Sequence, residues 1–312
     1  METLAVVLEE PQRLSLRTLG LQDAGDDDLV VEVDYSGVST GTERLLWSGR
    51  MPPFPGLGYP LVPGYESVGR VVGAGAHVRA RLGETVFVPG STAFIGARGL
   101  FGGAARTLVA PSARVPSIAE GLADQGILLA LAATARHAIA AGGGPPPELI
   151  LGHGVLGRLL ARIVVAEGHA PPTVWETNPA RRDGALGYPV IDPAEDARRD
   201  YRCICDASGA AGLLDQLIPR LARGGEIVLA GFYDTPLSFT FPPAFMREAK
   251  IRVAAEWAPE DLAAVARRVG DGRLPLDGLI THHAPPQDAD DAYHQAFTDQ
   301  SCLKMVLDWR GV

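Results

Sequence analysis

Lysine is almost absent from this chain of 312 residues, and long apolar runs are absent altogether. Only Lys250 and Lys304 occur, the formal net charge is -9, and no run of Lys and Arg appears. We therefore expect no nucleic-acid partner, because the neutralisation of phosphates needs a clustered basic face. No apolar stretch reaches the ~18 residues of a membrane span, so we expect no membrane-crossing segment.

Cysteine is also scarce, with an odd count of three: Cys203, Cys205 and Cys302. Such a count gives no disulfide framework and is typical of a reducing cytoplasm. The first residues, METLAVVLEEPQ, show no basic segment followed by an apolar one, so no signal peptide is expected. A hydrophobic content of 46% is normal for a globular protein with a sizeable core. We expect a cytoplasmic globular protein.

The chain changes character after its first third. Residues 1–117 carry short apolar runs such as LVVEVDYSGVS and ETVFVPG, closed by Gly and Pro, which favour a β-barrel-like domain. Residues 118–272 alternate strand-like runs such as ELILG with helix-like runs such as VLGRLLARIVVAEG. This alternation predicts a doubly wound parallel sheet with crossover helices. The tail, 273–312, returns to strand, helix and strand, so the chain as a whole is predicted to be α/β.

A glycine-rich loop follows the first predicted strand of the alternating part. The hexapeptide GHGVLG fits G-x-G-x-x-G and lies between an apolar strand and an apolar helix. Such a loop is typical of a dinucleotide site, in which the first glycine allows a tight turn, the second lets the backbone approach a pyrophosphate at the helix N-terminus, and the third lets helix and strand pack closely. We therefore predict cofactor contacts from Gly152, His153, Gly154, Val155, Leu156 and Gly157.

Glu176, which ends the next predicted strand, bears on the choice of dinucleotide. Its carboxylate should hydrogen-bond the adenosine ribose diol and repel a 2′-phosphate, which favours NAD over NADP. Arg181 and Arg182 follow closely and could receive a phosphate, although a solvated helix face is their more ordinary role. Loops at the carboxyl ends of later parallel strands line the same crevice, which adds Ser208 and Gly231 as expected contacts.

The order of these pieces resembles the medium-chain dehydrogenase/reductase superfamily over nearly the whole chain. The similarity is carried by YSGVSTGTE, PGYESVGRV, GETVFVPG, GLFGGAARTLVAP, LILGHGVLG and LARGGEIVLAGF. It implies a GroES-like catalytic domain from residues 1–117 and 273–312, a Rossmann domain from residues 118–272, and an active site in the cleft between them. It also implies a nicotinamide contact from Thr134, for which a hydroxyl bonded to its own helix backbone is the alternative.

Zinc members of this superfamily hold a catalytic metal with a cysteine, a histidine and a third Cys or Glu. The corresponding positions here carry Ser39, Tyr65 and, near the third position, Ala130. A neutral serine and a phenol do not replace thiolate and imidazole as zinc ligands. The segment VFVPGSTAFIGARG has no cysteine where a structural zinc lobe is expected. We therefore expect a member of the superfamily that holds no metal.

Without zinc, hydroxyl groups are left to polarise the reacting oxygen. An alcohol oxidised by hydride transfer must also lose its hydroxyl proton. By the resemblance, Tyr65 takes a metal-ligand position, so it could hydrogen-bond the alcohol oxygen directly. The groups expected to relay the proton or orient the network are Ser39, Thr40, Thr42 and Glu66. Packing without a chemical role is the alternative for Tyr65, and both interpretations stay open.

A closer resemblance, to the dehydrogenases of bacteriochlorophyll synthesis, lies in YSGVSTGTERLLWSGRMPPFPGLGYPLVPGYESVGRV, RGLFGGAART and VWETNPARR. It implies that NAD oxidises the C3 1-hydroxyethyl group of a bacteriochlorophyllide, a broad apolar tetrapyrrole, to an acetyl group. Large apolar residues near the expected cleft mouth could face such a ring, and they could equally be ordinary core residues. These residues are Trp47, Met51, Phe54, Leu57, Tyr59 and Phe101.

Two other functions stay open. One is a zinc-independent quinone or enone reductase of the same superfamily, against which Glu176 argues because such members mostly use NADPH. The other is a dinucleotide-binding protein that has lost catalysis and serves as a redox sensor or assembly partner. The sequence leaves the oligomeric state open, including a homodimer.

Overall fold

The computed structural model describes all 312 residues, which form two compact units. Unit 1 consists of residues 1–130 and 279–312, and unit 2 of residues 131–278. These borders lie beyond the positions 117 and 272 that the sequence suggested. On the N-terminal side the border moves because the 3-10 helix Glu120–Leu128 packs against strands of unit 1. Its composition resembles that of the following helix, so the sequence placed both in the same domain.

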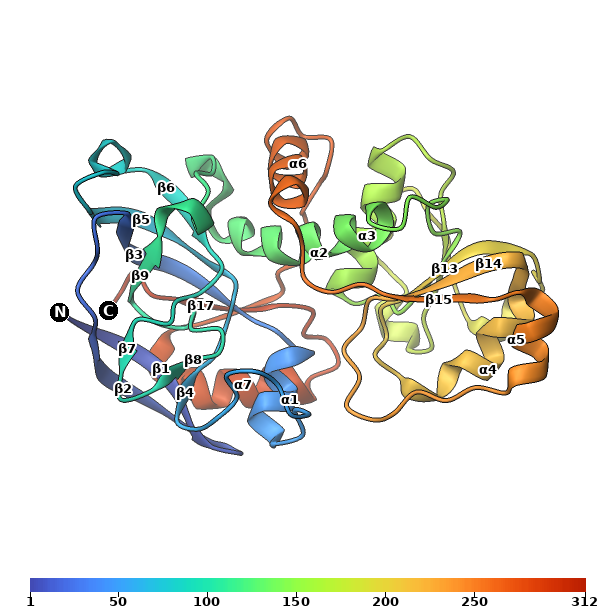
Figure 1. Ribbon diagram of the computed structural model, residues 1–312, viewed down its shortest axis with the longest axis horizontal. Helices are drawn as coiled ribbons and strands as arrows, with labels where there is room; N and C mark the ends of the chain where they lie inside the picture. Colours follow the sequence, from blue (N-terminus) through green and yellow to red (C-terminus); the bar gives the residue numbers. More distant parts are fainter. The chain divides into compact units, whose positions relative to one another are not determined.

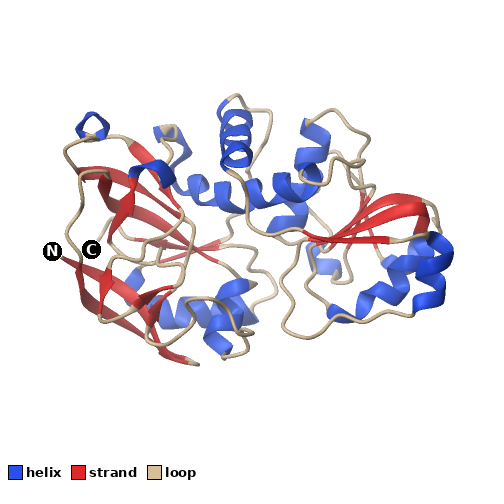
Figure 2. Ribbon diagram, viewed as in Figure 1, coloured by secondary structure: helices blue, strands red, loops and turns tan.

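Unit 1 is built around two sheets (Figures 1 and 2). The first has the strand order β7-β2-β1-β4-β8, and the second has the order β16-β17-β3-β5-β6, with β9 also paired to β3. Alternating Val and Leu side chains of these strands fill a buried core, as expected for sheets that cover an apolar interior. The strands are β1 (Glu2–Glu10), β2 (Arg13–Leu21), β3 (Asp28–Val38), β4 (Leu61–Val62), β5 (Ser67–Ala74), β6 (Thr85–Val88), β7 (Phe94–Ile95), β8 (Arg98–Gly99), β9 (Thr107–Pro111), β16 (His282–Ala284) and β17 (Met305–Asp308).

Two helices of unit 1 bring distant parts of the chain together. Helix α1 (Thr42–Ser48) follows β3, and helix α7 (Ala289–Thr298) lies in the C-terminal segment, yet Figure 1 shows them next to each other. The apolar stripe of α7, which includes Ala292, Tyr293 and Ala296, is buried at the spacing of one helix face. Because β17 then pairs antiparallel with β3, Met305 at the start of β17 is fixed beside Val38, shortly before α1.

Unit 2 is a parallel six-stranded sheet with the order β12-β11-β10-β13-β14-β15. Its strands are β10 (Leu149–Leu151), β11 (Thr173–Trp175), β12 (Val190–Ile191), β13 (Tyr201–Asp206), β14 (Leu221–Leu229) and β15 (Lys250–Val253). The helices are α2 (Leu129–Ala140), which carries the border between the units, α3 (Val155–Ala166), α4 (Leu214–Leu217), α5 (Phe241–Arg247) and α6 (Pro259–Gly270). Helices α4 and α5 lie along one side of β13, β14 and β15, and α5 contacts β14 (Figure 1).

The strand order of unit 2 locates its binding edge. The chain winds outward from β10 through β11 to β12, and then returns to the other side of β10 with β13. Ligands of such sheets bind outside the carboxyl ends of the strands at this switch point. The predicted α/β class, with a β domain and a doubly wound parallel sheet, is confirmed. No helix of the chain has the length and apolar character needed to cross a membrane.

Candidate active site

The glycine loop between β10 and α3 forms an open cradle. Gly152 has φ +90°, and a Cβ there would lie 3.4 Å from the Ser208 Cα. A Cβ on Gly157 would lie 1.8 Å from the Gly152 carbonyl oxygen, so only glycine fits. A Cβ on Gly154 would meet no atom within 4 Å, which leaves space directly before the free N–H groups of the first turn of α3. A pyrophosphate fits this arrangement of glycine, open space and helix N-terminus.

The carboxylate of Glu176 is fixed beside the glycine loop. Glu176 follows β11, and its Oε2 accepts the His153 N–H at 3.0 Å while its Oε1 accepts the Asn178 N–H at 2.8 Å. Each oxygen keeps a lone pair for a further donor, such as a ribose hydroxyl. The Arg182 guanidinium is engaged elsewhere, since it donates to the Glu176 carbonyl at 2.9 Å and to Asp192 at 2.5 Å.

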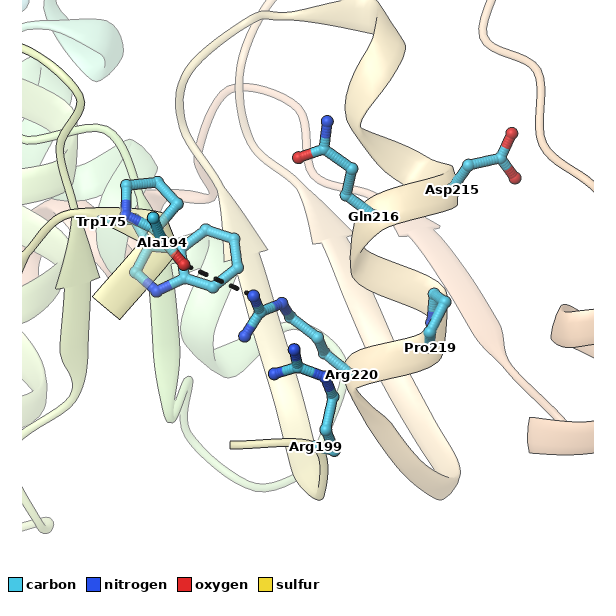
Figure 3. A pocket seen from close by; sticks show the side chains of 8 residues that line it. Trp175, Ala194, Arg199, Asp215, Gln216, Pro219 and Arg220 are labelled. Atoms are coloured by element: carbon cyan, nitrogen blue, oxygen red, sulfur yellow. Dashed lines mark hydrogen bonds between the residues drawn. The ribbon is translucent and has the colours of Figure 1, made fainter. Parts of the chain in front are cut away.

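A hollow in unit 2 shows how the end of β11 is held (Figure 3). The guanidinium of Arg220 stacks over the Trp175 ring at 4.4 Å, and Figure 3 marks its hydrogen bond to the Pro193 carbonyl. The indole also makes a hydrogen bond, because Trp175 Nε1 donates to the buried Asp196 carboxylate at 2.8 Å. Because Trp175 directly precedes Glu176, this packing fixes the strand end from which the acidic side chain projects.

His153, the second residue of the loop, lies behind the cradle. Its imidazole is fully buried, with Nδ1 2.6 Å from the Arg181 carbonyl and Nε2 3.0 Å from the Tyr188 hydroxyl. Burial lowers the pKa of His153 to about 4, so the ring is neutral at pH 7. Arg158, which sequence reasoning missed, joins the same network through bonds to the carbonyls of His153, Arg181 and Asp183. These side chains support the loop from within unit 2.

The other predicted cofactor residues divide into two groups. Ser208 follows β13 and Gly231 follows β14, so both lie at the same sheet edge as the glycine loop. Asp206 fixes this edge, since it accepts the Ser208 N–H at 2.8 Å and the Tyr233 hydroxyl at 2.9 Å. Thr134 forms the second group, since it is half-buried on helix α2 and does not belong to a loop at this sheet edge.

In unit 1, the hydroxyls of Tyr65 and Ser39 are directly bonded. Tyr65 donates to the Ser39 Oγ at 2.9 Å, with Thr42 as a further side-chain hydrogen-bond partner of the phenol. Burial, and then the nearby Glu66 charge, raise the pKa of Tyr65 above its ordinary value. The phenol therefore stays neutral and serves as a hydrogen-bond donor, not as a phenolate base. Thr40 lies half-buried in the loop between Ser39 and α1.

A cluster of buried charges lies behind this hydroxyl pair. Glu66 accepts the Lys304 ammonium at 2.6 Å, and Lys304 also lies 3.4 Å from the Val38 carbonyl. Val38 and Glu66 are the chain neighbours of Ser39 and Tyr65, so the ammonium ties together the two segments that carry the hydroxyls. A pair of this kind resists the loss of one partner, because the other charge would be left buried and uncompensated.

Glu43, a second buried carboxyl that sequence reasoning missed, completes the cluster. Its Oε2 accepts the Ser39 N–H at 2.5 Å, and its Oε1 accepts the Tyr293 hydroxyl at 2.7 Å. Burial raises the pKa of Glu43 to about 7. One signal could have found Glu43, namely an acidic residue in the first turn of a short helix directly after the serine–threonine loop.

The positions that correspond to zinc ligands have no donor set for zinc. Ser39 and Tyr65 offer two neutral hydroxyls, and Ala130 is a buried side chain without a donor atom. Zinc sites in proteins use thiolate, imidazole and carboxylate ligands. No group of three or more His, Cys, Asp and Glu side chains in the chain is placed to hold a metal ion. The residues present therefore do not fit a catalytic zinc.

The large apolar residues predicted near the cleft mouth come together in one cluster of unit 1. Met51 is buried in it, whereas Trp47, Phe54, Leu57, Tyr59 and Phe101 are half-buried at its border. The Phe101 ring meets the Tyr65 ring edge-on at 5.4 Å and the Phe54 ring at 6.2 Å. The Tyr59 hydroxyl donates to the Leu46 carbonyl, which fixes the orientation of that ring. The cluster is thus partly core and partly an apolar wall next to Tyr65.

Fold and site together define a class of protein. A parallel sheet with a glycine cradle and a following acidic residue, joined in one chain to a β unit of two sheets, is the architecture of the medium-chain dehydrogenases/reductases. Residues 25–120 match the family model described as alcohol dehydrogenase GroES-like domain. A short chain alcohol dehydrogenase from E. coli, solved with NADH, has the same fold, with a TM-score of 0.85, 21% identity and 99% of both chains covered.

Two relatives are similar over the full length. The chain is 57% identical to the 2-desacetyl-2-hydroxyethyl bacteriochlorophyllide A dehydrogenase of Rhodobacter capsulatus, with 99% of both chains covered. It is 56% identical to the protein of the same name from Cereibacter sphaeroides, with 100% of this chain and 99% of that protein covered. The chain belongs to this family of medium-chain dehydrogenases.

Proposed function

We propose that the protein oxidises the C3 1-hydroxyethyl group of a (bacterio)chlorophyllide to an acetyl group, with NAD as the hydride acceptor, in bacteriochlorophyll a synthesis. The observation that carries the proposal is the full-length similarity, at 57% and 56% identity, to two dehydrogenases named for this substrate. The site supports it with a hydroxyl pair where an alcohol could bind. Neither a quinone reductase nor a non-catalytic sensor is favoured by these relatives.

We assign cofactor binding to unit 2. Its glycine cradle has room for a pyrophosphate at Gly154, and the fixed Glu176 carboxylate suits the two hydroxyls of an adenosine ribose. A 2′-phosphate would be repelled by this carboxylate, and Arg182 is already engaged with Asp192. These features support NAD over NADP. When bound, the nicotinamide would supply the hydride-accepting carbon.

We assign alcohol activation to unit 1. Tyr65 is half-buried as a residue, and the proposal requires its hydroxyl to meet a substrate oxygen while it remains bonded to Ser39. A neutral phenol can take the alcohol proton only as it passes its own proton on, which makes Ser39 the next member of the relay. Thr40 lies in the loop after Ser39 and Thr42 begins α1, and the Lys304–Glu66 pair holds the two hydroxyl-bearing segments together. The proposal requires the nicotinamide end of the cofactor to reach Tyr65.

A ring-conjugated secondary alcohol suits a site without zinc. As hydride leaves, the developing positive charge on the carbinol carbon is delocalised into the tetrapyrrole, so weaker activation of the oxygen is sufficient. The apolar wall of Phe101 and Phe54 would cover one face of the macrocycle, while Trp47, Tyr59 and Met51 belong to the same cluster and could extend the wall. Apolar walls with few polar groups are typical of sites for large flat ligands.

We also propose a homodimer formed through the outer edge of β15. This strand ends the sheet of unit 2, and its Val253 side chain is 73% exposed. An exposed edge strand has unpaired backbone groups that a second copy can satisfy in an isologous pair. Light scattering should give twice the chain mass for the wild type and the single mass for Val253→Lys, and a wild-type monomer at micromolar concentration would contradict the proposal.

The function is tested in cells by deletion of the gene from an organism that makes bacteriochlorophyll a. The deletion strain should accumulate a hydroxyethyl-bearing precursor and should lack acetyl-bearing pigment. Normal pigment without precursor in that strain would refute the assignment.

A further inference from the structure

A buried carboxyl lies directly behind the Tyr65–Ser39 hydroxyl pair. Glu43 is 1% exposed, and the serine that accepts the Tyr65 hydroxyl also donates its backbone N–H to Glu43 at 2.5 Å. Tyr293, which is fully buried on α7, donates to the other carboxylate oxygen at 2.7 Å. Ser39 thus connects Glu43 to Tyr65, the residue whose hydroxyl we assign to contact with the substrate oxygen.

The charges around Glu43 favour the binding of a proton, because the cluster holds two carboxyl groups and one cation. The groups that face it are Glu66, Lys304, Tyr65 and Tyr293, of which only Lys304 is a cation. Lys304 is bonded to Glu66 at 2.6 Å. Of the two carboxyl groups in this cluster, Glu43 is therefore the one without a directly bonded cation. Burial raises the pKa of Glu43 to about 7, while the bonds from Ser39 and Tyr293 act in the opposite direction. Both protonation states are therefore accessible near neutral pH.

We propose that Glu43 accepts the proton that the alcohol releases during oxidation. This inference rests on the proposed function and adds a residue to it. The carbinol C–H bond breaks with its electron pair going to the oxidised nicotinamide, and the O–H bond breaks as the C=O bond forms. The alcohol proton goes to the Tyr65 oxygen, the Tyr65 proton to the Ser39 Oγ, and the Ser39 hydroxyl proton to the Glu43 carboxylate. The last transfer needs a rotation of the Ser39 side chain or one bridging water.

The experiment is the pH dependence of kcat, measured with NAD and a 3-hydroxyethyl bacteriochlorophyllide between about pH 5 and about pH 9, roughly two units either side of the Glu43 pKa of about 7. The wild type should lose activity below about pH 7, where Glu43 is already protonated. Glu43→Gln should lower kcat about 100-fold and abolish this acidic limb, because the variant has no group to titrate. Glu10→Gln, an exposed carboxyl of β1, is the matched control and should keep the wild-type profile.

Tyr293→Phe gives a second, independent prediction. Loss of its hydrogen bond removes a group that favours ionised Glu43, so the acidic limb should move to higher pH, while the limb itself persists. An acidic limb that is unchanged in both variants would overturn the role of Glu43 although the function stands. If Glu43→Gln folds poorly, an unmoved limb in Tyr293→Phe overturns it alone. If the wild type oxidises no hydroxyethyl chlorin, the proposed function fails and the role of Glu43 falls with it.

Discussion

The Tyr65 hydroxyl donates to the Ser39 Oγ at 2.9 Å, although the two residues lie 26 positions apart. Ser39 follows β3 and Tyr65 precedes β5, and these strands are paired neighbours in one sheet. The Lys304 ammonium, which contacts Glu66 and the Val38 carbonyl, links the two segments that carry these hydroxyls.

Replacement of Tyr65 by Phe should lower kcat by roughly 100-fold and change KM little, because the hydroxyl acts mainly on the charge that develops in the transition state. The measurement is steady-state kinetics with the hydroxyethyl substrate at saturating NAD. Phe54→Leu is the control for loss of aromatic contact in the same cluster, and it should raise KM more than it lowers kcat. Full turnover by Tyr65→Phe would leave the phenol without a chemical role.

The purified protein should contain no stoichiometric zinc, because Ser39, Tyr65 and Ala130 do not form a zinc site. Elemental analysis gives the zinc content, and incubation with a chelator should leave the oxidation rate unchanged. One zinc per chain, or activity that is lost to a chelator and restored by zinc, would contradict this account.

Replacement of Glu176 by Ala should reduce the preference for NAD over NADP by about tenfold or more, which corresponds to at least about 1.4 kcal/mol. The preference is measured as the ratio of kcat/KM for the two cofactors. Glu195→Ala, which removes an exposed carboxyl of the same unit, should leave the ratio unchanged. An unaltered ratio in Glu176→Ala, or a wild type that prefers NADP, would argue against the role of Glu176.

Glu43 should make the stability of the protein depend on pH even without cofactor or substrate. The folded protein binds the Glu43 proton more tightly than the unfolded chain, since burial raises its pKa from 4.5 to about 7. Its contribution to the free energy of unfolding should therefore decline as pH rises from about 4.5 to about 7, by up to roughly 3 kcal/mol in total. Urea unfolding of wild type and Glu43→Gln at several pH values isolates this contribution, and parallel pH profiles for the two proteins would contradict it.

The sequence predicted that the glycine loop and Glu176 lie together, as the structure shows, because the signals for both are local. Gly152, Gly154 and Gly157 lie within one turn between a strand and a helix, and Glu176 closes the next strand, so spacing alone indicates their proximity. The supporting residues were harder to find. His153 looked like a cofactor contact from its place in the motif, whereas its ring is turned toward Arg181 and Tyr188.

The buried charge cluster could not be predicted from local patterns. Glu43 meets Tyr293 across 250 positions, and Glu66 meets Lys304 across 238. These contacts exist because α7 and β17 bring the C-terminal segment back to β3. The spacing of residues in a single sequence does not predict contacts between segments so far apart. Lys304 stood out only as one of two lysines, and its burial beside Glu66 emerges from the fold.

The most direct test of the central claim is the reaction of the purified wild-type protein with a 3-hydroxyethyl bacteriochlorophyllide and NAD, followed by mass spectrometry of the pigment and by the absorbance of reduced nicotinamide. The account predicts acetyl product and reduced nicotinamide in equal amounts, a much lower rate with NADP, and no need for added metal. No acetyl product with either cofactor, from protein that still binds NAD, would contradict it.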